Sequence, residues 1–417
     1  MAQSQQLSEI EQQLIADVEA NYQETLDLLR ETVDINSGTF NLEGVKEVAE
    51  VYAREFKTIG FETEWIEMPE EMNRAGHFVA TRKGNTGNKL LLIGHLDTVF
   101  EESMPFTPFT IINDSTAIGQ GVNDMKGGNA MIFAALKALH QNELLNDAHI
   151  TVYFTGDEEN SGDPKEISRG DFIDRAIEAD IALGFETSQG FNIATTARRG
   201  ASSWTLHVTG RQAHSSGIFS ERTGYGAIFE AARILNQFRE ELTGEEFLTF
   251  NPGQIVGGSE ITYDDETTLG TSVGKTNIVA KDALVTGGLR FLGEDQKEDA
   301  RERMRHIVSQ NLNQTSAEIE FRDGIPSMPP TDGNDAVLQV LNQASRDLGF
   351  GEVVAGDPGS RGAADISFIA EYVDALDGIG ASGTGAHTPD ETINLNDFPD
   401  LIKRSTILIH RLIQPIE

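Results

Sequence analysis

The chain has 417 residues, with 67 acidic side chains against 32 basic ones, and its formal net charge is −35. This charge argues against nucleic acid or an anionic membrane as a partner, because both would be repelled. The length exceeds one typical core and favours two domains, and the absence of cysteine rules out disulfides and thiolate metal ligands. The acid-rich composition also suggests a salt-adapted host, a hypothesis that a rise in stability with salt would support.

The N-terminal sequence, residues 1–13, is polar and acidic, and it has neither the basic start nor the apolar segment of a secretory signal. No apolar run in the chain approaches the roughly 20 residues that span a bilayer. We therefore expect a cytoplasmic protein, although a processed periplasmic chain that had lost its signal would look the same.

The first motif with chemical content is the segment from Leu90 to Asp97, Leu-Leu-Leu-Ile-Gly-His-Leu-Asp. The apolar run predicts a buried strand, and His95 and Asp97, two residues apart on an extended chain, point the same way from its carboxyl end. Ligand sites of open α/β sheets lie at that end. An imidazole binds a borderline metal directly, and a nearby carboxylate orients it. By itself such a pair is commonly an ordinary strand exit, so the interpretation depends on the motifs farther along the chain.

The next segments add carboxylates and a second imidazole at comparable places. Asp124 lies in a glycine-rich loop ahead of a helix predicted from about residue 129 to 140, where a carboxylate can bridge two cations. Two more apolar strands are predicted at 150–154 and 181–185. The polar residues after these strands and in a second glycine-flanked loop are Asp157, Glu158, Glu159, Glu186 and His387. Adjacent acids repel one another in a plain turn, and a metal ion offsets that repulsion.

Together these positions offer two imidazoles and enough carboxylates for a two-metal site, with one acid left for proton transfer. Nitrogen and oxygen donors without sulfur suit two Zn²⁺ ions first, with Co²⁺ or Mn²⁺ as alternatives. Nucleophilic catalysis by the protein is disfavoured, because there is no cysteine and no evident Ser-His-acid arrangement.

With these motifs the chain resembles the co-catalytic zinc hydrolases, the superfamily of bacterial glutamate carboxypeptidase, aminoacylase, acetylornithine deacetylase and succinyl-diaminopimelate desuccinylase. Their order and spacing match over nearly the whole length, and the glutamate carboxypeptidase type looks closest. The matching segments are Gly94-His95-Leu96-Asp97, Gly121 to Gly128, Gly156 to Glu159, Gly184-Phe185-Glu186, Gln212 to Ser215 and Ala386 to Pro389.

The resemblance implies a role for each residue of the expected site. Asp124 would bridge the two ions, and its bond to Met125 would be cis, as in relatives. The further ligands would be His95 and Glu186 for one ion, and Glu159 and His387 for the other. Glu158 would be the general base for a water shared by both cations, and Asp97 would orient His95.

The element pattern predicts the domain organisation. Strands and helices alternate over residues 1–199 and again over 319–417, as a mostly parallel sheet covered by helices requires. Residues 200–318 follow an α+β pattern instead. Its predicted elements are strands at 204–208, 274–279 and 283–291 and helices at 223–242 and 294–312. We expect a phosphorylase/hydrolase-like catalytic domain with an inserted lid/dimerisation domain, and a ligand cleft between them.

Four residues outside the metal motifs are candidates for substrate contacts. The resemblance implies that His214 lies in the lid and reaches the oxyanion, often across the interface of a homodimer, and that Asn277 and Arg290 contact the substrate. Without the resemblance, His214 would be interpreted as an exposed side chain in a surface loop, and Arg290 as one partner of a structural ion pair. Arg361 lies where glutamate carboxypeptidases carry a Gly-Gly-Gly-Thr-Asp-Ala-type loop, so the chain departs from that type there.

The predicted activity is hydrolysis of an amide bond next to a free carboxylate, in a small peptide or an N-acyl amino acid. An exopeptidase of the glutamate carboxypeptidase type is the first interpretation, and an N-acyl-amino-acid deacylase of the aminoacylase, acetylornithine deacetylase or desuccinylase type is the alternative. A catalytically silent homologue is a third possibility, but the presence of every expected ligand together with the base argues against it.

Overall fold

The computed structural model describes residues 7–265 and 267–415, and these form two compact units. Unit 1 comprises Met1–Thr196, Pro330–Asp357 and Ala364–Glu417, and unit 2 comprises Ala197–Pro329 and Pro358–Ala363. The boundary predicted at residue 318 is misplaced, because it falls inside strand β14 (Thr315–Asp323), which extends the unit 2 sheet. The short return segment 358–363, which carries Arg361, also joins unit 2 rather than the catalytic part.

Unit 1 is built on a mixed, mostly parallel sheet, which confirms the predicted fold class. In spatial order its strands are β1 (Glu62–Ile66), β2 (His77–Arg82), β6 (Ala148–Thr155), β3 (Thr86–His95), β7 (Ile181–Gly184) and β16 (Asp374–Leu376). β3 runs parallel to β6 and β7, and β16 parallel to β7, while β1 and β2 form an antiparallel edge.

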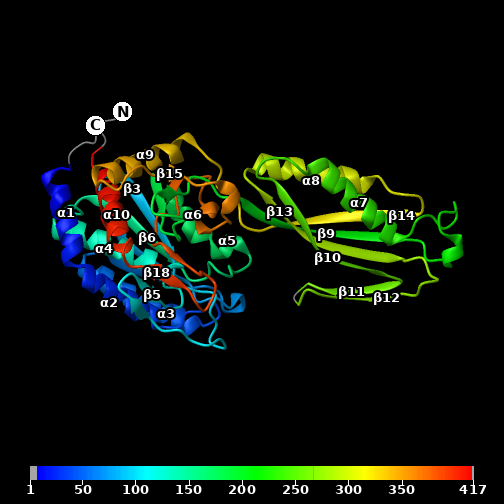
Figure 1. Ribbon diagram of the computed structural model, residues 1–417, viewed down its shortest axis with the longest axis horizontal. Coiled ribbons are helices and arrows are strands. Elements are labelled where there is room, and N and C mark those ends of the chain that lie inside the picture. The colour runs from blue at the N-terminus through cyan, green and yellow to red at the C-terminus, as the bar shows by residue number, and fades with distance from the viewer. Residues whose placement is uncertain (1–6, 266, 416–417) are drawn as a thin grey trace. The chain divides into compact units, whose positions relative to one another are not determined.

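Helices cover both faces of this sheet. They are α1 (Glu9–Ala20), α2 (Tyr22–Val33), α3 (Leu42–Thr58), α4 (Lys126–Gln141), α5 (Lys165–Ser168), α6 (Gly170–Ile177), α9 (Asp332–Asp347) and α10 (Phe398–Leu412). Successive residues of a strand face opposite sides, and on β6 Tyr153 packs on Phe172 of α6 while Phe154 packs on Tyr52 of α3. Helices α1 and α10, from opposite ends of the chain, lie side by side (Figure 1).

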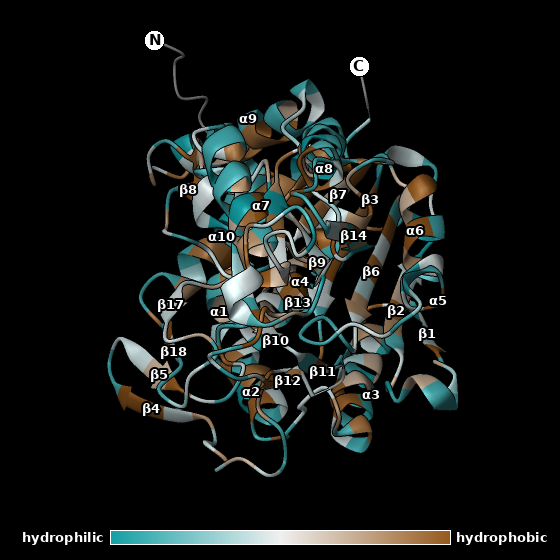
Figure 2. Ribbon diagram, turned by 90° about the vertical axis from the view of Figure 1, so that its right-hand side faces the viewer, coloured by the Kyte–Doolittle hydropathy of each residue, from teal (hydrophilic) through white to brown (hydrophobic). Residues whose placement is uncertain are grey.

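A second small sheet in unit 1 connects two segments that matter for the site. Its strands, in spatial order, are β17 (Gly383–Thr384), β18 (Thr392–Asn394), β5 (Thr116–Ile118) and β4 (Thr110–Asn113). The pairing of β18 with β5 holds the His387 loop beside the chain that leads to Asp124. At its edge, β4 exposes Ile111 and Ile112, which make this strand brown in Figure 2. A short parallel pair, β8 (Ile193–Ala194) and β15 (Val354–Ala355), completes the strands of the unit.

Unit 2 is an antiparallel sheet with two helices packed on it. The sheet has the order β10 (Thr249–Gly258), β13 (Asp282–Phe291), β9 (Gly200–Gly210) and β14, and a separate pair is formed by β11 (Glu260–Asp264) and β12 (Leu269–Val273). Helices α7 (Ala227–Leu242) and α8 (Glu294–Ser309) lie together on one face of the sheet (Figure 1). Alternate residues of β9, among them Trp204 and Leu206, contribute to their shared core.

Two predictions of local structure in unit 2 were wrong, and one strand was missed. Residues 274–279 form a turn with an isolated bridge at Ile278 instead of a strand, because only Ile278 and Val279 are shielded from solvent and residues 274–277 are exposed. β10 was missed because Pro252 and Gly253 interrupt its pattern, and they lie at a shift of register on an edge strand. Helix α7 begins at Ala227 rather than residue 223, after Gly226 with φ of 74°.

The described residues contain no helix whose length and apolar content would let it cross a membrane.

Candidate metal centre

Three parallel strands of unit 1 end at the same edge of the sheet, as the sequence predicts. His95 at the end of β3 pairs in register with Thr155 of β6, and Ile93 pairs with Gly184 of β7. The chain after β6 therefore delivers Glu158 and Glu159 to the same edge as His95. Glu186 follows β7 by two residues and arrives there as well.

The first cluster of possible metal ligands consists of His95, Asp124 and Glu186. The Nε2 atom of His95 is 3.3 Å from Oδ1 of Asp124 and 3.6 Å from Oε1 of Glu186. The His95 side chain is buried, and the two carboxylates are about one-seventh exposed, at 13% and 14%. One imidazole nitrogen thus faces two carboxylate oxygens, which is a donor set that suits a divalent ion.

The second cluster consists of Asp124, Glu159 and His387 and shares Asp124 with the first. Nε2 of His387 lies 3.1 Å from Oδ2 of Asp124 and 3.3 Å from Oε2 of Glu159. Asp124 therefore presents one oxygen to each histidine. In each cluster the possible ligand atoms lie within 4.8 Å of one another. This arrangement suits two neighbouring divalent ions that share one carboxylate.

The carboxylates change the protonation of both imidazoles in the metal-free protein. Burial alone would lower the pKa of His95, but hydrogen bonds to Asp124 and Asp97 and the charge of Glu186 raise this pKa well above its usual value. Hydrogen bonds to Asp124 and Glu159 raise the pKa of His387 to about 10. A metal ion must therefore displace a proton from each imidazole, so metal binding releases protons and weakens in acid.

Asp97 is fully buried, and its carboxylate mainly holds the backbone that carries the two glutamates. Its Oδ1 accepts from the Glu158 N–H at 3.0 Å, and its Oδ2 accepts from the Glu159 N–H at 3.2 Å and from the Thr39 hydroxyl at 2.6 Å. The nearest acceptor to Nδ1 of His95 is the Asp97 carbonyl oxygen at 3.0 Å, while the carboxylate is 3.4 Å away. Asp97 thus contacts His95 and also fixes the loop of Glu158 and Glu159. The sequence did not predict this second contact.

Glu391, to which the sequence assigns no role, organises the loop that carries Asp124. Its buried carboxylate accepts from the backbone N–H groups of Gly121, Asn123 and Asp124 at 2.8 to 2.9 Å. Burial raises the pKa of Glu391 to about 7, although these donors oppose the shift. Glu391 lies four residues after His387, so its carboxylate links the loop of His387 to the loop of Asp124.

The glycines of the Asp124 loop serve close packing. A Cβ at Gly128 would lie 2.1 Å from the carbonyl oxygen of Phe185, so only glycine lets α4 approach the end of β7. Helix α4 begins at Lys126, earlier than the predicted residue 129, because this packing outweighs the low helix propensity of Gly127 and Gly128. The Asp124–Met125 bond is cis, as the resemblance implies.

Glu158 is half-buried beside the first cluster and does not belong to either ligand cluster. It lines a cavity of about 10 Å³ together with His95, Glu186 and Asp365. Burial, and then the charge of Glu186, raise the pKa of Glu158 well above its usual value. A carboxylate with a raised pKa beside a metal cluster suits a group that accepts and returns a proton.

The remaining candidates all belong to unit 2. A bridge between His214 and Ile278 and a hydrogen bond from the Ser215 N–H to the Asn277 carbonyl, at 2.9 Å, bring the His214 and Asn277 segments together. Arg290 lies apart from them on β13, and the side chains of His214, Asn277 and Arg290 are exposed. The Arg361 segment is held by Arg198 and Arg199, which donate to the carbonyls of Gly362 and Gly359.

Comparisons with known proteins agree with this geometry. Carboxypeptidase G2 from Pseudomonas sp. (strain RS-16) is 24% identical over 390 residues, which cover 91% of this chain and 87% of that protein. Succinyl-diaminopimelate desuccinylase from Methylobacillus flagellatus is also 24% identical, over 94% of this chain and 99% of its own length. The crystal structure of aminopeptidase PepT from Bacillus cereus shares the fold, with a TM-score of 0.74 at 18% identity over 94% of this chain and 99% of that one.

A family model described as peptidase family M20/M25/M40 matches residues 91–411, which is most of the chain and includes every residue of both ligand clusters. The expected superfamily is thereby confirmed: the protein belongs to peptidase family M20/M25/M40 and is a metal-dependent hydrolase.

Proposed function

We propose that the protein is an exopeptidase of the glutamate carboxypeptidase type, which hydrolyses an amide bond next to a free carboxylate. The observation that carries this proposal is the pair of ligand clusters that share Asp124, with the separate carboxylate of Glu158 beside them. The match to carboxypeptidase G2 along 91% of the chain supports the choice of this type.

In this proposal two divalent ions, zinc first, occupy the two clusters. His95 and Glu186 would hold one ion, Glu159 and His387 would hold the other, and Asp124 would be shared by both. The donor set fits, because imidazole nitrogens and carboxylate oxygens converge without sulfur. When bound, such ions polarise the substrate carbonyl and make water acidic. In this proposal, side chains of the protein carry out proton transfer and substrate binding.

Glu158 is the general base in this mechanism. It removes a proton from the attacking water and returns that proton to the leaving amine, which preserves charge balance over the reaction. The two hydrogen bonds from the Glu158 and Glu159 N–H groups to Asp97 fix the loop before substrate binds. The reaction therefore does not have to include the entropy cost of ordering this loop.

Unit 2 supplies substrate contacts in this proposal and acts as the lid. His214 donates to the developing oxyanion, Arg290 or Arg361 pairs with the free carboxylate of the substrate, and Asn277 donates a further hydrogen bond to the substrate. The cluster of His214 with Asn277, and the separate positions of Arg290 and Arg361, agree with different contacts along an extended substrate.

We also propose that unit 2 forms a homodimer. An exposed apolar patch on this unit, made of Phe219, Tyr225, Ile228 and Phe229, supports an interface there, because soluble monomers seldom expose several large apolar side chains together. Light scattering would test this proposal. A dimer that dissociates in Phe229→Asp would support it, and a monomeric wild-type protein would contradict it.

An N-acyl-amino-acid deacylase is the second candidate. The desuccinylase match favours it, because that relative is equally identical and aligns over 99% of its own length. The two activities share the hydrolytic step and differ in which side of the amide is recognised.

A substrate panel distinguishes these functions. Zinc-reconstituted protein should be assayed with folate-like and N-benzoyl glutamates, dipeptides, and acetyl and succinyl amino acids, with and without a chelator. We expect chelator-sensitive release of C-terminal glutamate. Preference for acetyl or succinyl groups would establish the deacylase instead, and no hydrolysis of any substrate by metal-loaded protein would overturn both.

A further inference from the structure

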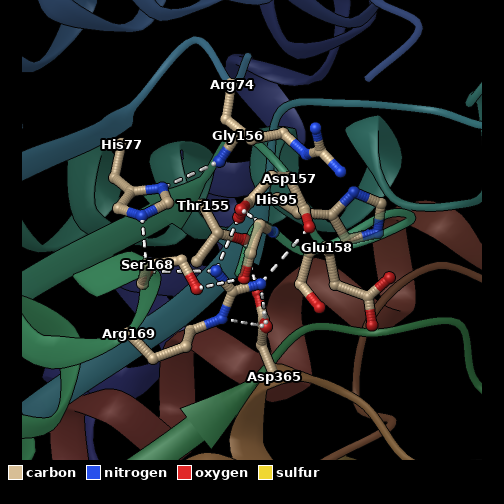
Figure 3. A network of polar contacts seen from close by, with 12 residues as sticks. Arg74, His77, His95, Thr155, Gly156, Asp157, Glu158, Ser168, Arg169 and Asp365 are labelled. Carbon is tan, nitrogen blue, oxygen red and sulfur yellow. Dashed lines mark hydrogen bonds and ion pairs between the residues drawn. The ribbon is translucent and has the colours of Figure 1, made fainter. Parts of the chain in front are cut away.

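A fully buried arginine lies behind the loop that carries Glu158 and Glu159. Arg169 is 0% exposed, and its guanidinium lies between two buried carboxylates from distant parts of unit 1 (Figure 3). Nη1 donates to Oδ1 of Asp157 at 2.6 Å, and Nε donates to Oδ1 of Asp365 at 2.9 Å. Asp365 follows Asp157 by more than two hundred residues, so the arginine ties together segments that the sequence separates widely.

The two carboxylates pass this restraint on to the loop backbone and its flanks. Oδ2 of Asp365 accepts from the Thr155 hydroxyl at 2.5 Å, at the end of β6. Oδ2 of Asp157 accepts from the Gly162 N–H at 2.8 Å, which closes the loop on itself. Nη2 of Arg169 also donates to the Asp157 carbonyl at 3.3 Å. The loop is thus held at its start, at its end and at the residue directly before Glu158.

His77 completes the support of this loop from β2. Its Nδ1 accepts from the Gly156 N–H at 3.1 Å, and its Nε2 donates to the Ser168 carbonyl at 2.8 Å, next to Arg169 (Figure 3). Because His77 and Asp97 both accept from this loop, the backbone N–H groups of Gly156, Glu158 and Glu159 all meet side-chain acceptors. Side chains of distant segments therefore determine the path of this loop.

Removing three charged groups from water costs free energy that their mutual attraction does not always return. Arg169, Asp157 and Asp365 belong to neither ligand cluster, so metal binding does not account for them. They contact the loop that carries two adjacent glutamates, and the side chains of these glutamates lie in different places. Glu159 points to His387, at 3.3 Å, while Glu158 lines the cavity beside His95 and Glu186.

We propose that Arg169, with Asp157 and Asp365, is a positioning residue that sets the place of the Glu158 carboxylate. This inference rests on the proposed function of Glu158 as the base. Displacement of a reacting group by about 1 Å can cost about 100-fold in rate. Loss of the arginine network should therefore reduce kcat without removing the metal ions or changing substrate affinity.

The main test is Asp365→Asn in the full-length, zinc-loaded protein. This change leaves Arg169 and Asp157 as a neutral pair, so the protein should fold. We expect kcat to fall about 100-fold while KM and the zinc content per chain stay at their wild-type values. Arg169→Met should lower kcat at least as far, and Arg169→Lys should recover part of the loss, because lysine keeps the charge without the fork geometry.

A matched control is Arg404→Met, since Arg404 is also buried in unit 1 but donates to the Phe191 carbonyl, away from the clusters. It should lower thermal stability and leave kcat unchanged. Hydrogen exchange of the 155–162 peptide gives a readout that needs no activity. Exchange there should accelerate in Asp365→Asn and stay at the wild-type rate in Arg404→Met.

The outcomes separate this inference from the proposed function. Wild-type kcat and wild-type exchange of the 155–162 peptide in Asp365→Asn would overturn the positioning role. A loss of zinc in parallel with the loss of kcat would also overturn it, because the network would then serve metal binding. A wild-type protein that hydrolyses no substrate would overturn the proposed function instead, and the exchange experiment would still test whether the network holds the loop.

Discussion

The metal-site residues of unit 1 and the substrate-contact candidates of unit 2 differ in how the protein holds them. In unit 1, Asp97 and His95 are buried, and the Asp97 carboxylate accepts a hydrogen bond from the backbone N–H of Glu158. In unit 2, Asn277 and Arg290 are exposed, and within the described residues their side chains make no hydrogen bond or ion pair. Asp97 and His95 are thus ordered in advance, whereas Asn277 and Arg290 lose side-chain entropy only when they bind substrate as proposed.

The largest effect that this contrast predicts is in unit 1, at Glu158. Glu158→Gln should lower kcat by up to about 10⁴-fold, the upper range for loss of a general base. The metal content should stay at its wild-type value, because Glu158 belongs to neither ligand cluster. Steady-state kinetics and metal analysis of the same preparation check both parts. Activity close to wild type would contradict the base assignment.

The next effect concerns unit 2. His214→Ala should lower kcat by about 100- to 1000-fold, as expected for loss of an oxyanion donor, with no change in metal content. Ser216→Ala is a useful companion, because the Ser216 hydroxyl lies 2.8 Å from Nδ1 of His214 and fixes the ring. The companion variant should show a smaller loss. If His214→Ala keeps the wild-type kcat, this exposed histidine has no part in the chemical step.

A third experiment tests the preorganisation of unit 1 directly. Glu391→Gln replaces a carboxylate that accepts from Gly121, Asn123 and Asp124. Loss of such an outer partner should weaken metal affinity by about 10- to 100-fold, which a competition titration with a chromophoric chelator measures. Arg290→Ala in unit 2 is the control, and its metal affinity should not change. Equal affinities in the two variants would show that the Asp124 loop needs no such support.

The smallest expected effect is a dependence of stability on pH through His77. Burial, against the opposing charge of Asp157, lowers the pKa of His77. The unfolded chain, with an ordinary histidine pKa of about 6.5, then binds a proton before the folded protein does. The stability contribution is therefore present above pH of about 6.5 and is lost as the pH falls toward the folded pKa.

His77→Gln should flatten the decrease of the free energy of unfolding between pH 7.5 and pH 5, by about 1.4 kcal/mol for each unit by which the pKa of His77 differs between the unfolded and folded states. Melting temperatures of both proteins across this range measure the effect. His149→Gln provides the comparison, since His149 is only half-buried. The assignment fails if the wild type and His77→Gln have parallel profiles.

The sequence predicted the arrangement of the site well because its signal is local. Apolar strands that end in His95, Glu158 and Glu186 imply one sheet edge once the strands are parallel, and the structure has that edge. The two ligand clusters use the residues that the sequence singled out. What each residue does there stays a prediction, as do the roles of His214, Asn277, Arg290 and Arg361.

The partners behind the site could not be predicted, because they come from remote positions without a pattern of their own. Thr39, Asp365 and Glu391 contact the site loops from segments far away in the chain. An aspartate or a threonine in an ordinary polar context gives no sign that it will be buried. Unit 2 was harder for another reason: its sheet is exposed on one side and contains Pro252 and several glycines, so alternation alone missed strand β10.

The return of residues 358–363 to unit 2 has a consequence for how substrate preference changes in evolution. An exchange of residues 197–329 between two relatives would transfer His214, Asn277 and Arg290 as a block, but it would leave Arg361 with the recipient. Recombination at the obvious boundaries therefore produces hybrids with mixed ancestry in one unit. With the substrate contacts proposed above, substrate preference would then change in two steps, one by exchange of the large segment and one by point mutation in the short one.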